Sequence, residues 1–214
     1  MRPLAIVDLD GPLLDVAARY FAAHRRALAT TGAQGRHADS GAFWAAKRAR
    51  APAADLLLAG DPGTYAAAFR DRVEDDDLLA LDALHPGALA ALQRLAAAVD
   101  VHVLSLRTRG DAARRSVARL GVESIAPVTF VVHGPDGKVP AARALGRGRD
   151  VVAVIGDTEA DAAVARALGA SFVGVACGIR TAEALLAEGA SFVGAGLDAA
   201  VAHVLAARDD RGAC

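Results

Sequence analysis

Apolar residues are grouped in short runs along the chain, and each run ends in small or polar residues. The runs are Leu4–Val7, Val101–Leu104, Val128–Val132, Val151–Ile155 and Phe172–Val175. Runs that are apolar at nearly every position are typical of strands buried on both faces of a parallel sheet. The residues of Gly169–Gly174 recur at Gly189–Gly194, which predicts one more strand of the same sheet.

Segments rich in Ala, Leu and Arg separate most of these runs. Their apolar residues have helical spacing, as in Ala88–Ala98, Asp111–Leu120 and Asp161–Leu168. Strands that alternate with helices form right-handed βαβ units, in which helices cover both faces of the sheet. The sequence therefore predicts an α/β fold with a doubly wound, mostly parallel, Rossmann-like sheet.

The alternation stops between Val16 and Leu84. We expect no strand in this segment, only helical stretches separated by turn residues: Val16–Ala29, Gly41–Arg50, Ala53–Ala59 and Tyr65–Leu81. Pro86 and Gly87 mark the return to the α/β pattern. We therefore predict two domains, a Rossmann-like core of residues 1–15 and 85–214 and an inserted α-helical cap of residues 16–84.

Composition narrows the classes of protein that fit this pattern. The 214 residues are 54% hydrophobic and 23% charged, which supplies a core and is not typical of disorder. A net charge of −1 gives no reason to expect binding to nucleic acid or to a membrane surface. No apolar stretch approaches the roughly 20 residues of a membrane span. Cys177 and Cys214 are too few for a disulfide framework, so we expect a cytoplasmic protein.

Two aspartates, Asp8 and Asp10, follow the first apolar run. Residues i and i+2 of a strand point to the same face, so the two carboxylates converge. Like charges held close together at the edge of a core are costly unless a positive charge compensates them. The pair is therefore either part of a solvated turn or a site for a cation.

Polar residues also follow three other predicted strands. Ser105 ends one strand, Lys138 follows the turn of residues 133–137, and Asp157 and Asp161 lie in the stretch GDTEAD. Ligands of doubly wound sheets bind at the carboxyl ends of the strands. Taken singly, Ser105 is equally typical of a helix N-cap, Asp161 of a capping box and Lys138 of a surface position. Their recurrence at successive strand ends favours a shared site.

Taken together, these residues resemble the motifs of the haloacid dehalogenase (HAD) superfamily. Its Asp-x-Asp-Gly signature matches Asp8–Gly11, its Ser or Thr matches Ser105, its Lys matches Lys138, and its Gly-Asp-x-x-x-Asp motif matches Gly156–Asp161. The resemblance covers the whole chain. It is to the phosphatase type with a helical cap inserted after the first motif, as in phosphoglycolate phosphatase-like proteins.

The resemblance implies a Mg²⁺-dependent phosphohydrolase. Its substrate would be a small phosphorylated metabolite, such as a phosphoglycolate-like acid or a sugar phosphate. Asp8 would attack phosphorus and form an aspartyl-phosphate, and Asp10 would protonate the leaving alcohol and then activate water. Dehalogenases of the superfamily lack an aspartate at the position of Asp10. The phosphoryl group would be bound by Ser105, by the amides of Leu106 and Arg107, and by Lys138.

The resemblance also implies a magnesium site. Because Mg²⁺ prefers oxygen ligands, Asp8 and Asp157 would bind it through their carboxylates and Asp10 through its carbonyl oxygen. Asp161 would not bind the ion directly but would hold its ligands in position. The metal would then be the charge that compensates the aspartates. The sequence departs from the family at Pro12, where Thr is usual, and a residue without an N–H would stiffen the hinge to the cap.

Substrate choice is expected to reside in the cap. Trp44, Lys47 and Arg48 share one helix face, and Lys47 is placed to reach an anionic group of the substrate. The alternative interpretation of this face is that Trp44 packs in the cap core and that Lys47 is solvated. Two other functions stay open, a phosphomutase of the same superfamily and a non-catalytic member that binds a ligand or partner.

Overall fold

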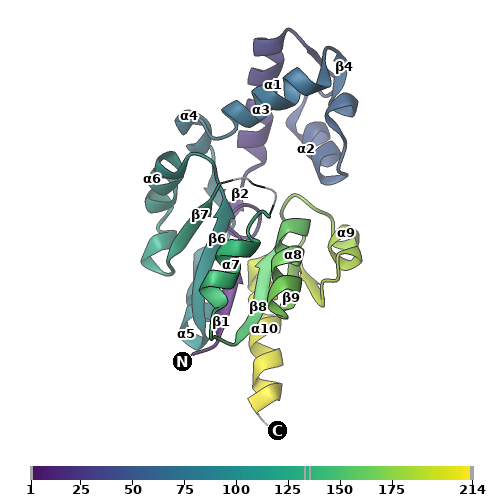
Figure 1. The fold of residues 1–214 in the computed structure, drawn as a ribbon. Coiled ribbons are helices and arrows are strands. Elements are labelled where there is room, and N and C mark those ends of the chain that lie inside the picture. Colours follow the sequence, from purple (N-terminus) through teal and green to yellow (C-terminus); the bar gives the residue numbers. More distant parts are fainter. Residues whose placement is uncertain (1, 133, 135, 213–214) are drawn as a thin grey trace.

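A six-stranded sheet forms the centre of the molecule. The computed structural model describes residues 2–132, 134 and 136–212, drawn in Figure 1. The strand order is β10-β9-β8-β1-β6-β7, and the neighbouring strands are parallel. The strands are β1 (Leu4–Val7), β6 (Asp100–Leu106), β7 (Val128–Val131), β8 (Val151–Gly156), β9 (Ser171–Val175) and β10 (Phe192–Gly194). The predicted Rossmann-like sheet is confirmed.

Helices cover both faces of the sheet. Ala5 and Val7 of β1 pack in one cluster with residues of α5 (Ala88–Ala98), α6 (Gly110–Leu120) and α10 (Leu197–Gly212). Leu4 and Ile6, which point to the opposite face, pack with α7 (Val139–Gly146), α8 (Glu159–Leu168) and α9 (Ala182–Ala187). Burial on both faces explains why β1 is apolar at every position.

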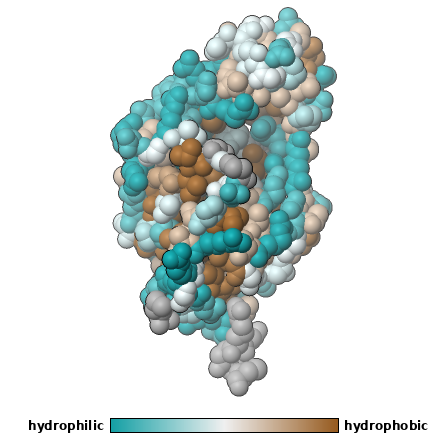
Figure 2. All heavy atoms as spheres, in the orientation of Figure 1, coloured by the Kyte–Doolittle hydropathy of each residue, from teal (hydrophilic) through white to brown (hydrophobic). Residues whose placement is uncertain are grey.

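The segment inserted after β1 has a core of its own. It contains α1 (Ala17–Thr31), α2 (Ser40–Arg48), the 3-10 helix η1 (Ala53–Leu56), α3 (Pro62–Arg72) and α4 (Asp76–Leu79). Phe43, Leu56, Leu57 and Tyr65 are buried together within it. In Figure 1, α1, α2 and α3 lie above the sheet. Figure 2 shows the surface hollowed between these elements and the part that contains the sheet.

The expectation that this segment contains no strand is wrong. Gln34–Gly35 (β3) pairs antiparallel with Leu57–Ala59 (β4), so the stretch predicted as one helix, Ala53–Ala59, divides into η1 and a strand. Strands this short carry no usable alternation of apolar and polar residues.

The predicted helix Tyr65–Leu81 is interrupted as well. Chain residues 73–75 separate α3 from α4, and the Glu74 carboxylate accepts the backbone N–H groups of Thr108 and Arg109 at 3.0 and 2.7 Å. Ser116 of α6 donates to the Leu79 carbonyl at 3.3 Å. This part of the insertion is therefore fixed to α6 of the sheet-containing part.

A short antiparallel ribbon joins the insertion to the sheet. Leu14–Asp15 (β2) pairs with Ala83–Leu84 (β5), next to the proposed boundaries after residues 15 and 84. The division into core and cap remains a proposal.

Cys177 forms no disulfide among the described residues, and Cys214 lies outside them, as do His133 and Pro135 of the predicted turn before Lys138. Within the described ranges, no helix is both long and apolar enough to cross a membrane.

Candidate active site

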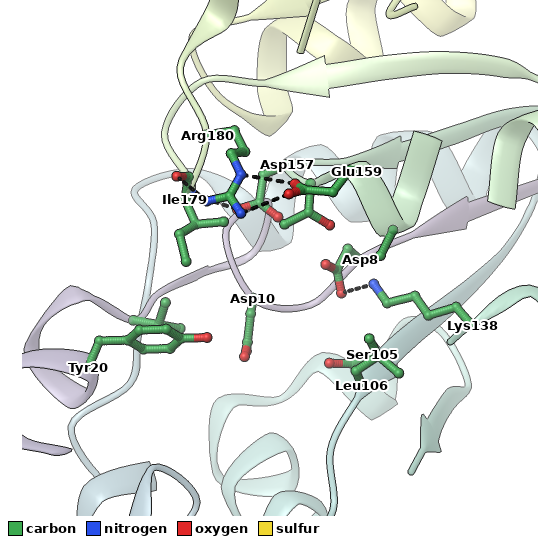
Figure 3. Close-up of a pocket in the computed structure, with 13 residues that line it drawn as sticks. Asp8, Asp10, Tyr20, Ser105, Leu106, Lys138, Asp157, Glu159, Ile179 and Arg180 are labelled. Atoms are coloured by element: carbon green, nitrogen blue, oxygen red, sulfur yellow. Dashed lines mark hydrogen bonds and ion pairs between the residues drawn. The ribbon is translucent and has the colours of Figure 1, made fainter. Parts of the chain in front are cut away.

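Polar side chains from several strand ends meet in a cavity of about 240 Å³ at the carboxyl edge of the sheet (Figure 3). It is lined by Asp8 and Asp10 after β1, Ser105 and Leu106 of β6, Lys138 before α7, and Asp157 after β8. Parallel neighbours place their carboxyl ends side by side, so residues separated by about 150 positions become neighbours. The structure thus brings together six of the residues singled out in the sequence.

Lys138 links two of the carboxylates. Its ammonium lies 2.8 Å from an oxygen of Asp8 and 2.8 Å from an oxygen of Asp161, and all three side chains are buried. Burial alone would lower the pKa of Lys138, but the charges of Asp161 and Asp8 raise it above its ordinary value. Burial and the charge of Asp161 raise the pKa of Asp8 to about 7. Lys138 is therefore charged and only partly compensates its two neighbours.

Asp157 is the least compensated carboxylate of this group. The N–H of Ile179 donates to Oδ2 at 2.5 Å, whereas Oδ1 is buried and has no hydrogen-bond partner among the described residues. Burial, followed by the charges of Asp8 and Asp161, raises the pKa of Asp157 well above its ordinary value. Gly11 and Gly178 leave room for this carboxylate, since a Cβ on either would lie within 2.2 Å of its Oδ2.

These carboxylates fit a divalent cation. One oxygen each of Asp8, Asp157 and Asp161 lies within 4.8 Å of the others, and Lys138 is the ammonium among them. A set of oxygen donors suits a hard ion such as Mg²⁺. The buried Oδ1 of Asp157, which no described residue contacts by a hydrogen bond, is open to such an ion. Asp161 is already engaged, because it accepts from Lys138 at 2.8 Å and from the Thr158 hydroxyl at 2.7 Å.

Asp10 belongs to a second charged group. Arg19 of α1 donates to it at 2.7 Å and Arg107 donates to its other oxygen, and both arginines also pair with Asp82, at 2.9 and 3.3 Å. Burial would raise the pKa of Asp10, but the charges of Arg107 and Arg19 outweigh this effect and lower it to about 2. Two aspartates and two arginines balance one another. The carboxylate group of Asp8, Asp157 and Asp161, and not this one, is the group that could hold a metal ion.

The predicted role of Arg107 in phosphate binding is wrong for its amide. That N–H donates to the Val131 carbonyl at 2.9 Å in the sheet, and the side chain is turned toward Asp10 and Asp82. The residue before it, Leu106, does line the cavity with Ser105. Lys47 lies elsewhere, in the wall of a neighbouring cavity that is lined mostly by the insertion.

Several residues of the site were not found from the sequence. Arg180 binds Glu159 through two hydrogen bonds of 2.9 Å, and this pair lines the cavity, as do Tyr20 and Ile179 (Figure 3). Arg19 and Tyr20 are adjacent in α1, whose amphipathic pattern marks them only as helix residues. The loop 177–180 has no motif. Only the buried position of an arginine, which a sequence does not reveal, would have distinguished Arg19.

Contacts between the insertion and the sheet-containing part close one side of the site. Arg48 of α2 donates to the carbonyls of Ala176 and Arg180 at 2.7 and 3.2 Å, and Arg180 donates to the Lys47 carbonyl at 3.2 Å. The ion pair of Arg50 with Glu188, at 2.9 Å, lies farther out. Helix α2 is thus docked on the loop that also carries Ile179, the partner of Asp157.

The parallel sheet, the insertion after β1 and the carboxylates at the strand ends define a Rossmann-like α/β protein with a charged cavity at the carboxyl edge of its sheet. The model of the family described as haloacid dehalogenase-like hydrolase matches residues 3–169, and a second, HAD-hydrolase-like model matches residues 139–200. The chain belongs to the haloacid dehalogenase-like hydrolase family. A search of curated proteins finds no match.

Solved structures share the fold over the whole chain. A haloacid dehalogenase-like hydrolase from Streptococcus pneumoniae is 16% identical with a TM-score of 0.73, covering 97% of this chain and 98% of that chain. A candidate phosphoglycolate phosphatase from Lactobacillus delbrueckii subsp. bulgaricus is 20% identical with a TM-score of 0.68, covering 96% and 98%. A candidate β-phosphoglucomutase from Thermotoga maritima is 19% identical with a TM-score of 0.63, covering 94% and 98%.

Proposed function

We propose that this hydrolase is a Mg²⁺-dependent phosphatase that cleaves a small phosphomonoester through an aspartyl-phosphate. The observation that carries the proposal is the meeting of Asp8, Asp10, Ser105, Lys138 and Asp157 in one cavity. Phosphoryl transfer needs a nucleophile, a proton carrier and positive charge around the transferred group, and this cavity supplies each of them. The low cysteine content supports a cytoplasmic location.

In the first step, a carboxylate oxygen of Asp8 forms a bond to phosphorus while the bond from phosphorus to the alcohol oxygen breaks. The charge that develops on the phosphoryl oxygens is stabilised by the Lys138 ammonium, by the Ser105 hydroxyl and by the amide of Leu106. Lys138 is suited to this role because it already lies 2.8 Å from Asp8. Asp161 holds Lys138 in place through its second 2.8 Å ion pair.

Asp10 would carry the protons of both steps. It gives a proton to the leaving alcohol, then takes one from the water that attacks the phosphorus of phospho-Asp8, so that inorganic phosphate leaves and Asp8 is restored. In the described conformation, Arg19 and Arg107 occupy both oxygens of Asp10 and keep it ionised. This conformation suits the second step. The first step requires Asp10 to part from at least one arginine, which a movement of α1 would achieve.

Asp8 and Asp157 would hold the metal with their carboxylates and Asp10 with its carbonyl oxygen, while Asp161 supports them through Lys138. The bound ion would offset the negative charge of the phosphate and of the surrounding aspartates. The orphaned oxygen of Asp157 supports this assignment.

The test is phosphate release from a panel of small phosphomonoesters, with Mg²⁺ and with excess EDTA. Release that requires Mg²⁺ supports the phosphatase. Conversion of a sugar phosphate into its isomer without free phosphate would instead indicate a phosphomutase. A folded protein that does neither would contradict both and leave the ligand-binding alternative.

A further inference from the structure

A second cavity of about 350 Å³ lies next to the acidic cavity, lined mostly by the inserted segment and also by Thr108 and Ile179 of the sheet-containing part. Tyr20 and Ile179 line both cavities, and Figure 3 shows them on one side of the acidic site. An alcohol esterified to a phosphate at Asp8 would therefore extend between these two side chains into the second cavity. Its volume is typical of pockets that hold small organic ligands.

The walls of this second cavity are mostly apolar, formed by side chains such as Leu56, Ala66, Phe69 and Val73. Its polar residues include Arg70 and Thr108, which are exposed, and Tyr65 and Glu74, whose side chains are already engaged. The Tyr65 hydroxyl lies 2.6 Å from His24 Nδ1, and the Glu74 carboxylate accepts two backbone N–H groups at 3.0 and 2.7 Å. Hydroxyl groups placed against such walls lose their bonds to water without gaining partners, which is unfavourable. The cavity thus favours an apolar body over a sugar.

The wall contains two cations, Lys47 and Arg70; Arg70 is exposed, whereas Lys47 is half-buried. Its ammonium lies 5.3 Å from the centre of the Phe69 ring and 6.0 Å from that of Tyr20, and no described carboxylate is within ion-pair distance of it. Its charged neighbour Arg180 is already paired with Glu159. Burial and the charge of Arg180 lower the pKa of Lys47. An ammonium group that lies beside aromatic rings and has no anionic partner can form an ion pair with an anionic group of a ligand.

We propose that the second cavity binds the alcohol part of the substrate, an apolar and preferably aromatic body that carries a carboxylate, and that this carboxylate pairs with Lys47. The inference rests on the proposed function and narrows it. Phosphoglycolate has the carboxylate without the apolar body, and sugar phosphates have neither. Both are therefore weaker substrates than an ester that fills the cavity.

Three esters of primary alcohols test this inference: 4-carboxybenzyl phosphate, benzyl phosphate and glucose 6-phosphate. With Mg²⁺ present, we expect kcat/KM to be about tenfold higher for the carboxybenzyl ester than for the benzyl ester, as for one charge-assisted hydrogen bond. Both benzyl esters should exceed glucose 6-phosphate. Lys47→Met should reduce the ratio between the two benzyl esters to about one, and Lys47→Arg should restore most of it.

Arg25→Met is the matched control, because Arg25 is an exposed cation of the same insertion that lines neither cavity. It should leave the ratio unchanged. Equal cleavage of the two benzyl esters by the wild-type protein, or a ratio that survives Lys47→Met, would overturn the inference even if a variant were poorly folded. So would a preference for glucose 6-phosphate, although the phosphatase itself would then stand. Failure to release phosphate from any of these esters would contradict the proposed function.

Discussion

The guanidinium of Arg19 donates to the Asp10 carboxylate across 2.7 Å and is itself almost fully buried, with 1% of the side chain exposed. Its Nε also lies 2.9 Å from Asp82, which precedes the returning strand β5. Arg19 therefore joins the chain that leaves the sheet, the first helix of the insertion and the chain that returns. Asp10, the proposed proton carrier, is thus connected through Arg19 to both chain segments that join the insertion to the sheet.

Replacing Arg19 tests how much this network stabilises the protein. Arg19→Met leaves Asp82 buried with less compensation, and burial already raises the pKa of Asp82 to about 6. Removal of one partner of a buried ion pair lowers the free energy of unfolding by about 3 kcal/mol or more. We expect a decrease of this size for Arg19→Met, measured by urea denaturation at pH 7. The double variant Arg19→Met with Asp82→Asn should recover part of this loss. A double variant as unstable as the single one would show that the loss comes from packing instead.

Asp8→Asn tests the nucleophile. An amide retains the shape of the side chain but does not attack phosphorus, so phosphate release should fall by at least about a thousandfold. The melting temperature should not decrease, because Asp8 stands in an acidic group where burial and Asp161 raise its pKa. A variant that folds and still releases phosphate at the wild-type rate would remove Asp8 from this role.

Asp157→Asn tests the metal site without relying on activity. In EDTA the variant should melt at a higher temperature than the wild-type protein, since the buried carboxylate is poorly compensated there. Addition of Mg²⁺ should raise the melting temperature of the wild-type protein, because an ion that binds only the folded state stabilises it, and should affect the variant much less. Equal stabilisation of both proteins by Mg²⁺ would place the ion elsewhere.

The sheet and the positions of the carboxylates were predictable because both follow from local patterns. Apolar runs define the strands, and residues that end parallel strands meet at one edge, which brought Asp8, Ser105 and Asp157 together. The ribbon of β3 and β4 was missed because its strands are too short to show a pattern. Arg19 and Arg107 were not assigned to Asp10 because their pairing depends on how the hinge returns to the sheet, which no local spacing encodes.

Arg48→Ala tests the docking of α2 on the sheet-containing part. The wild-type side chain donates to the carbonyls of Ala176 and Arg180, so its loss should reduce the fraction of molecules in which the insertion covers the site. Apparent affinity falls with the fraction of competent molecules, and we expect KM to rise by about tenfold. Arg25→Ala is the matched control, because it removes the same kind of side chain from an exposed position of the insertion, and it should leave KM unchanged. A KM equal to that of the wild-type protein would show that these hydrogen bonds do not govern closure.

We expect His24 to make the inserted segment sensitive to acid. It is fully buried, stacks on Phe43 at 4.5 Å between ring centres, and pairs with Tyr65. Burial, with smaller contributions from the charges of His37 and Lys47, lowers the pKa of His24 to about 4. In the unfolded chain the pKa of His24 is about 6.5. At a pH between the folded and the unfolded pKa, the unfolded chain binds more protons than the folded protein. The free energy of unfolding therefore has its full value above about pH 6.5 and declines toward pH 4.

The expected loss from this one group is about 2 to 3 kcal/mol between pH 7 and pH 4.5, by linkage at about 1.4 kcal/mol per pKa unit. Urea denaturation at the two pH values measures it. His24→Phe combined with Tyr65→Phe removes the titrating ring and its partner together, so the hydrogen bond is lost without an orphaned hydroxyl. The double variant should lose less stability on acidification, whereas Tyr65→Phe alone, which keeps the histidine, should lose as much as the wild-type protein. If the double variant also loses as much, the acid sensitivity arises from the carboxylates of the site and not from His24.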